Sequence, residues 1–419
     1  MLDGIYSLNG GSTGISGILI SLSLMLILGF LMTRVTKLLR LPNVTAYIVT
    51  GILIGPHVLD MIPDAFIEGT EFITDIALAF IAFSVGEHFE FSKLRSNGRK
   101  SLVITLFESM TASLFVFGAM FFILRLDFVF SLVLAALAAA TAPASTIMTI
   151  RQTGARGDYV DTLLQVVAMD DVTGLIAYSI AIAFASSRVL AASGGGTFRV
   201  VFLPLLLNLL LMVLGAGFAW LLKFMTPTRR TADNRLIIAV AILLMFSGVS
   251  ALLDVSPLLG CMAMGMVFAN IEGHEKLFKQ LNYFSPPILL LFFVRSGLTF
   301  DLRALTSSQA IGATTLATAG IVYFFVRLAG KYAGAYAGSS LAGKPREVRN
   351  YLGLALAPQA GVAIGLAALC ARQLGPEVGG TLQTIILASS VLYELIGPAS
   401  AKLGLYLSGS YSEERPKAP

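Results

Sequence analysis

Two adjacent carboxylic acids, Asp170 and Asp171, lie in the middle of an apolar segment of about residues 159–186. A segment of that length can cross a bilayer as a helix, which takes about 20 residues. An acidic side chain at the centre of such a helix costs about 2.5–3.5 kcal/mol on insertion scales. Neighbouring helical residues point about 100° apart, so one basic partner would struggle to neutralise both acids. The pair therefore indicates a cation or proton site inside the membrane, with a structural salt bridge as the alternative.

The composition places this acidic pair in a polytopic membrane protein. Of the 419 residues, 56% are hydrophobic and only 13% are charged, a balance foreign to soluble domains. The formal net charge of +5 reflects basic loops and does not indicate nucleic-acid binding. The sequence shows no glycine-rich phosphate loop and no nucleophile triad. We therefore expect no enzyme and no cofactor.

The hydropathy pattern predicts an all-α protein of about thirteen membrane spans. They lie at about residues 14–36, 43–62, 70–88, 100–124, 128–150, 159–186, 199–222, 235–253, 256–270, 284–300, 309–336, 349–371 and 380–404. Most basic loop residues fall on one side of this arrangement, which the positive-inside rule makes cytoplasmic. We expect a multi-pass protein of the cytoplasmic membrane, with the N-terminus outside and the C-terminus inside. Residues 1–407 form the membrane domain, followed by a short cytoplasmic tail, 408–419.

Five further charged residues inside the predicted spans bear on this site: Glu108, Glu394, Arg295, Arg327 and Lys331. With the aspartate pair, the interior holds four acids and three bases, a balance that suits one monovalent cation or proton. We interpret Glu108, Arg295, Arg327 and Glu394 mainly as structural ion pairs in the core, with Glu394 and Arg327 as the preferred partners.

Two spans are interrupted by proline, at Pro143 in the fifth and at Pro358-Gln359-Ala360-Gly361 in the twelfth. Proline removes a backbone donor, and the carbonyls it frees must find partners or line a cavity. Each interrupted span is the middle of a group of three, and the two groups cross the membrane in opposite directions. Broken helices at matching positions of inverted repeats indicate a transporter's binding site, although a simple proline kink is the alternative at each.

Several motifs, in order along the chain, carry a family resemblance. They are Leu41-Pro42-Asn43 with Gly55-Pro56, Phe80 to Gly86, Thr141-Ala142-Pro143, Asp170-Asp171, Gly330-Lys331 with Gly334, and Tyr393-Glu394 with Gly397-Pro398. Together they resemble the monovalent cation:proton antiporters, and among these the bacterial sodium/proton branch of the second cation:proton antiporter family. The resemblance implies the antiporter fold of inverted repeats with two crossed broken helices, and a homodimer.

The aspartate pair carries the finer resemblance. Asp-Asp together with Lys331 resembles the electrogenic Na⁺/H⁺ type, whereas electroneutral relatives tend to have Asn-Asp and potassium-efflux relatives Gln-Asp. By this resemblance Asp171 binds Na⁺ (or Li⁺) and Asp170 pairs with Lys331. Hydroxyls of Thr141, Ser145 and Thr173, with freed backbone carbonyls, are the further candidate ligands.

Antiport requires that a proton and a cation compete for one site, and a buried carboxylate takes up a proton more readily than an exposed one. Alternating access would come from core spans at about 100–186 and 309–404, which move against scaffold spans at about 14–88 and 199–300. A K⁺/H⁺ antiporter on the same fold stays an alternative, as does a Na⁺-coupled organic-anion symporter.

Overall fold

The structure is a computed structural model. It describes residues 15–38, 43–87, 89, 91–142, 146–147, 149–150, 153–191, 197–227, 229–253, 257–271, 275–300, 310–311 and 314–411. The chain divides into two compact units. The first comprises Met1–Phe91, Ile182–Ser307 and Ile364–Leu387, and the second comprises Ser92–Ala181, Ser308–Ala363 and Ala388–Pro419.

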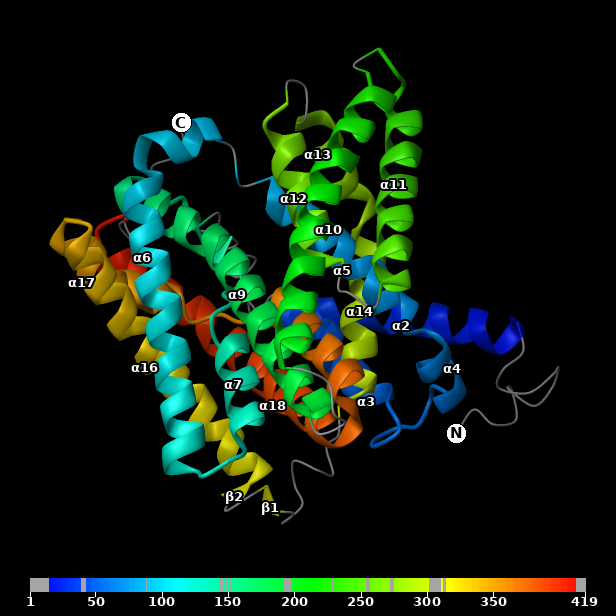
Figure 1. Ribbon diagram of the computed structural model, residues 1–419, viewed down its shortest axis with the longest axis horizontal. Coiled ribbons are helices and arrows are strands. Elements are labelled where there is room, and N and C mark those ends of the chain that lie inside the picture. The colour runs from blue at the N-terminus through cyan, green and yellow to red at the C-terminus, as the bar shows by residue number, and fades with distance from the viewer. Residues whose placement is uncertain are drawn as a thin grey trace. The chain divides into compact units, whose positions relative to one another are not determined.

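The described residues of the first unit form helices and no strand (Figure 1). They are α2 (Ile15–Leu38), α3 (Asn43–Ile54), α4 (Asp64–Gly69), α5 (Phe72–Gly86), α10 (Thr197–Met225), α11 (Ala232–Leu252), α12 (Leu258–Ala269), α13 (Glu275–Phe284) and α14 (Pro286–Leu298). Helix α12 packs against α5 and α10, and α14 packs against α3. Proline at the first position of α14 separates it from α13, and the two helices meet at 49°.

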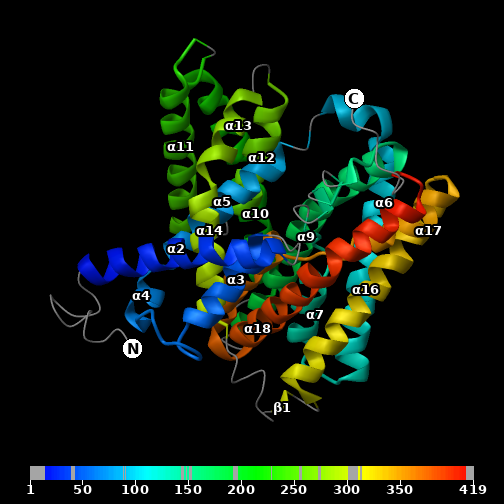
Figure 2. The same ribbon diagram turned by 180° about the vertical axis from the view of Figure 1, so that it is seen from behind.

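The second unit contains most of the buried charged residues and most of both interrupted spans. Its elements are α6 (Phe91–Gly118), the π-helix η1 (Ala119–Ile123), α7 (Phe128–Leu137), α9 (Asp158–Ala191, up to Ala181), a hairpin of β1 (Ala310–Ile311) with β2 (Thr314–Thr315), α16 (Leu316–Leu341) and α17 (Arg346–Ala355). Helices α6 and α16 run side by side in both views (Figures 1 and 2).

The last helix, α18 (Gly361–Leu407), contributes to both units. It is bent at Gly375, whose φ of 77° falls in the left-handed region that glycine adopts without a steric penalty. Apolar stretches 361–375 and 377–407 therefore form two helices rather than one. Residues 364–387, which the sequence groups with the core spans, pack within the first unit.

Each of the thirteen predicted spans contains a helix. Six helices among the described residues are long and apolar enough to cross a membrane, and α13 with α14 would make a seventh. Five shorter apolar helices correspond to further predicted spans: 43–54, 72–86, 128–137, 258–269 and 361–375. The prediction of an all-α membrane protein is confirmed, apart from the hairpin β1–β2.

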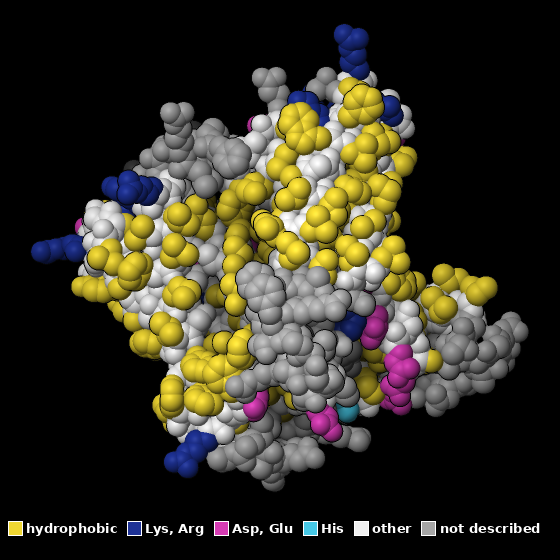
Figure 3. Space-filling view, viewed as in Figure 1, with side chains coloured by type: hydrophobic (Ala, Val, Ile, Leu, Met, Phe, Trp, Pro, Cys, Tyr) yellow, Lys and Arg dark blue, Asp and Glu magenta, His cyan; other side chains and the backbone are white. Residues whose placement is uncertain are grey.

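The surface supports the same conclusion. Figure 3 shows hydrophobic side chains covering the visible face of α10 and α11. Val213, Trp220 and Phe224 of α10 and Ile237 and Met245 of α11 are exposed. An apolar surface of this extent would promote aggregation in water, and it is the surface expected of helices that contact lipid.

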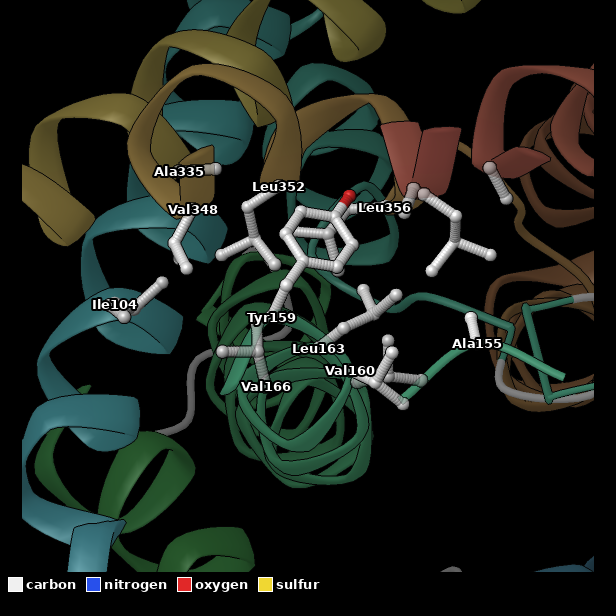
Figure 4. Close-up of a cluster of buried hydrophobic side chains, with 14 residues drawn as sticks. Ile104, Ala155, Tyr159, Val160, Leu163, Val166, Ala335, Val348, Leu352 and Leu356 are labelled. Carbon is white, nitrogen blue, oxygen red and sulfur yellow. The ribbon is translucent and has the colours of Figure 1, made fainter. Parts of the chain in front are cut away.

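The second unit has its own apolar core at one end of α9 (Figure 4). Tyr159 and Leu163 of α9 pack against Leu352 of α17 and Ile104 of α6. The hydroxyl of Tyr159 also donates to the carbonyl of Tyr351, 2.9 Å away. This core holds α9 against α6 and α17, and thereby sets the position of the aspartate pair further along α9.

Candidate ion-binding site

A row of glycines on α16 brings the charged residues together. Three glycines lie one helical turn apart, at Gly330, Gly334 and Gly338. A Cβ on Gly334 would lie 2.7 Å from the Cα of Glu108, so no larger residue fits between α16 and α6. Small residues at this spacing are typical of close helix pairs in membranes. The close approach places Lys331, beside Gly330, against Glu108.

Lys331 is the centre of a buried charge cluster. Its ammonium nitrogen lies 2.5 Å from Oε1 of Glu108 and 3.2 Å from Oδ2 of Asp170, and the side chains of all three are fully buried. The same nitrogen donates to the backbone carbonyl of Ala139 and to the hydroxyl of Thr141. One ammonium group therefore forms ion pairs with two carboxyl groups at once. The resemblance led us to expect one, Asp170.

Hydroxyl groups complete the surroundings of Asp170. Thr141 donates to Oδ2 at 2.8 Å, and Ser109 donates to Oδ1 at 3.1 Å. The hydroxyl of Thr173 lies 2.9 Å from that of Ser109 and donates to the backbone carbonyl of Asp170. Thr141 and Thr173 thus hydrogen-bond around Asp170, although we had expected both to be ligands at Asp171.

Asp171 differs sharply from its neighbour. It is 1% exposed, and its Oδ1 is buried without a hydrogen-bond partner among the described residues. A buried carboxylate oxygen with nothing to bind costs several kcal/mol unless a proton or a cation takes the place of water. The expected ligand Ser145, together with Pro143, lies outside the described residues. Asp171 is thus the member of the aspartate pair that keeps a buried oxygen without a partner among the described side chains.

The two interrupted spans meet directly. After α7 ends at Leu137, the backbone amide of Ala142 donates to the carbonyl of Pro358, 2.9 Å away. Gln359 adds a second connection, because its amide nitrogen donates to the carbonyl of Leu137 and its oxygen accepts from Tyr323. Helix resumes at Gly361 as α18. The crossing of the two breaks, implied by the resemblance, is present in the second unit.

Arg327 satisfies the carbonyls that these breaks expose. Its three nitrogens donate to the carbonyls of Ala138, Ala140 and Ala357 at 2.7–2.9 Å. Its guanidinium also lies 4.6 Å from the ring centroid of Tyr393, a cation–π contact.

The sequence predicts an ion pair between Arg327 and Glu394. Among the described side chains, no ion pair joins these two residues. A planar fork of five N–H groups suits several carbonyls at once. Carbonyls that we expected as sodium ligands already accept hydrogen bonds from Arg327, Lys331 and Gln359.

Arg295 belongs to the first unit and not to this cluster. It donates to the hydroxyl of Thr74 and to the carbonyl of Ile67, and its closest acid, Glu71, is 3.9 Å away. The interpretation of Arg295 as one half of a core ion pair is therefore poorly supported, because Glu71 is largely exposed.

Sequence reasoning missed Ser109 and gave Glu108 only a structural role. The one available signal was that Glu108-Ser109 puts a second acid and a hydroxyl together inside an apolar span. Which span they would face depended on the approach of α6 to α16, and that approach is visible only in three dimensions.

Three carboxyl groups and one ammonium group share this buried site. Were all of them charged, two formal negative charges would remain uncompensated in a low-dielectric interior, which is strongly unfavourable. The site must therefore carry protons or a bound cation in any stable state. An arrangement that holds either one, on crossed broken helices, defines a secondary transporter of monovalent cations and protons.

The comparisons identify the family. The chain belongs to the sodium/hydrogen exchanger transmembrane family, which matches residues 20–397. It is thus a cation/proton antiporter and not an enzyme. It is similar to the ammonium/H⁺ antiporter subunit AmhT of Alkalihalophilus pseudofirmus, with 22% identity over 287 residues, 68% of this chain and 70% of that protein.

Two solved structures share the fold. Both are of the sodium proton antiporter MjNhaP1 from Methanocaldococcus jannaschii. The structure at pH 8 has a TM-score of 0.73 and 18% identity, and covers 94% of this chain and 99% of the other. The second, from electron microscopy, has a TM-score of 0.71 and 16% identity, and covers 97% and 100%. The antiporter fold therefore extends over nearly the whole chain.

Proposed function

We propose that this antiporter exchanges Na⁺ or Li⁺ for H⁺ at Asp171. The observation that carries the proposal is the buried Oδ1 of Asp171, which has no partner among the described side chains, next to a cluster in which Asp170 is already fully bonded. A small hard cation prefers oxygen ligands, and a carboxylate can release it only by accepting a proton. Proton and cation therefore exclude one another at this one group.

Lys331 supports an electrogenic cycle. With three acids and one base in the site, entry of one monovalent cation replaces up to two protons, one at Asp171 and one within the Lys331–Asp170–Glu108 group. Exchange of two protons for one cation moves a net charge across the membrane. Glu108 strengthens this reading because it gives Lys331 a second acid with which to share its proton. The Asp-Asp pair with this lysine places the chain, in our proposal, in the sodium/proton branch of the second cation:proton antiporter family.

Alternating access follows from the same site. We propose that spans at about 100–186 and 309–404 move against those at about 14–88 and 199–300, and that Asp171 faces each side in turn. We also propose a homodimer in the cytoplasmic membrane, with the N-terminus outside and the C-terminus inside. Basic residues gather in the loops that this orientation makes cytoplasmic.

K⁺ and NH₄⁺ are the competing cargoes. The relative AmhT is named as an ammonium/H⁺ antiporter subunit, which makes ammonium the second candidate. An Asp-Asp pair instead of Gln-Asp favours Na⁺ over K⁺ by the resemblance stated above.

The test is proton flux in proteoliposomes of purified protein, with a pH-sensitive dye inside. Na⁺, Li⁺, K⁺ and NH₄⁺ salts are added in turn at equal ionic strength. We expect Na⁺ and Li⁺ to drive proton movement, and the variant Asp171→Asn to abolish it while eluting as a folded protein. Flux driven by K⁺ or NH₄⁺ alone would refute the assigned cargo. Full flux in Asp171→Asn would refute the assigned residue.

A further inference from the structure

A cavity of about 400 Å³ is lined by residues of the first unit, whereas the aspartate pair belongs to the second. Residues of α5, α14 and the two halves of α18 line it, among them Glu71, Thr74, Arg295, Thr299, Arg372 and Thr384. The bend of α18 at Gly375 places residues 368–372 and 380–384 on the same cavity. The proposed antiport uses none of these side chains.

Arg295 is the unusual residue in this cavity. It is 8% exposed and uses two of its nitrogens on Thr74 and on the carbonyl of Ile67. Its Nε is buried with no hydrogen-bond partner in the described part of the chain. A buried guanidinium N–H without an acceptor costs free energy, and arginine side chains are rarely buried unless paired.

The neighbouring acids do not neutralise Arg295. Glu71 is 3.9 Å away with a side chain 60% exposed, so water screens this contact. Asp75 is committed to Arg372, which binds both of its carboxylate oxygens at 2.9 Å. Of the charged residues that line the cavity, Arg372 is paired with Asp75, so among the described residues the charge of Arg295 is opposed only by the largely exposed Glu71.

We propose that this cavity binds a small oxyanion, a carboxylate or phosphate group, with Arg295 as its charge partner. The guanidinium fork matches two oxygens of such a group, and charge-assisted bonds of this kind are the strong ones. The amide of Gln383 is a neutral donor on the same wall and makes only a 3.3 Å contact with Thr299. The volume lies in the range of small-molecule sites and exceeds what a bare ion needs.

The oxyanion has two possible sources, a free solute or the headgroup of an anionic lipid. The test measures the thermal unfolding midpoint of the purified protein in detergent, at constant ionic strength and pH. Inorganic phosphate, acetate and a short-chain phosphatidylglycerol are titrated separately. A ligand that binds only the folded protein raises the midpoint in a saturable way.

We expect saturable stabilisation of the wild type by at least one of the three ligands. The variant Arg295→Gln should weaken the apparent affinity by about tenfold or more, because a charge-assisted pair is lost. Arg125→Gln, which removes an exposed arginine remote in sequence from the cavity, is the matched control and should bind as the wild type does. An effect of phosphatidylglycerol without phosphate or acetate would assign the oxyanion to a lipid, and the reverse would assign it to a solute.

Two results would overturn the proposal. One is the absence of saturable stabilisation of the wild type by all three ligands, which does not depend on whether any variant folds. The other is equal affinity in Arg295→Gln and the wild type. Neither result bears on cation exchange at Asp171, because the two sites share no residue.

Discussion

On the proposed cycle, replacing Lys331 by methionine should turn electrogenic exchange into electroneutral exchange. The substitution keeps an unbranched apolar stem of similar length and removes only the ammonium group. Two fully buried carboxyl groups, Glu108 and Asp170, then lose their common partner. Whether these two carboxyl groups stay ionised or take up protons determines the net charge that the variant moves in each cycle.

The distances allow the magnitude to be worked out. At an effective dielectric constant of about 20, pairs 2.5 and 3.2 Å apart have Coulomb energies of about 7 and 5 kcal/mol. Protonating an ordinary carboxyl group at pH 7 costs about 4 kcal/mol, since it titrates about three pH units lower. The loss of attraction exceeds that cost for either acid. Both therefore stay protonated through the cycle of the variant, and only Asp171 exchanges its proton.

The assay imposes a membrane potential on proteoliposomes and compares Na⁺-driven proton flux with and without it. Wild-type flux should change with the potential, and Lys331→Met flux should not. Lys344→Met is the control, because Lys344 is also nearly buried but pairs with Asp158, which is half exposed. That pair contributes about 1 kcal/mol or less, so the control should keep its potential dependence.

A second readout follows from the same reasoning. Folded Lys331→Met binds more protons than its unfolded chain at neutral pH, so its stability should fall as pH rises. The wild type takes up fewer protons on folding, because Lys331 compensates one of the three carboxylates, and it should show a weaker trend. If Lys331→Met kept the full potential dependence of the wild type, the assignment of Lys331 to charge coupling would be wrong.

Three further predictions concern Asp171, Arg327 and the contact between α6 and α16. Lowering the pH should raise the apparent KM for Na⁺ by up to about tenfold per unit for each competing proton, and a pH-independent KM would contradict competition at Asp171. Arg327→Met should lower the free energy of unfolding by about 3 kcal/mol or more, because three carbonyls lose their donor; an unchanged midpoint would contradict this. Gly334→Leu should abolish exchange by forcing α16 from α6, whereas Gly320→Ala, whose added Cβ would meet no atom within 4 Å, should not.

Local patterning accounts for much of what could be foreseen. Hydropathy predicts the spans, because a segment surrounded by lipid must be apolar and must satisfy its backbone within itself. Pro143 and Pro358 mark the two breaks for an equally local reason, since proline has no backbone donor. Asp170 and Asp171 indicate the site because two adjacent acids are too costly to be incidental in a membrane helix.

The partners of each charge depended on tertiary structure. The local sequence does not show whether a lysine pairs with one acid or with two. Glu108 contacts Lys331 only because three glycines of α16 face α6. Arg327 likewise binds carbonyls instead of Glu394 because the two breaks meet beside it. Charge and hydropathy are properties of the residues themselves, and the amino-acid sequence determined the membrane fold and the acidic pair through them. Distances between helices belong to the packed protein, and they alone decided that Asp170 is hydrogen-bonded while an oxygen of Asp171 has no partner among the described residues.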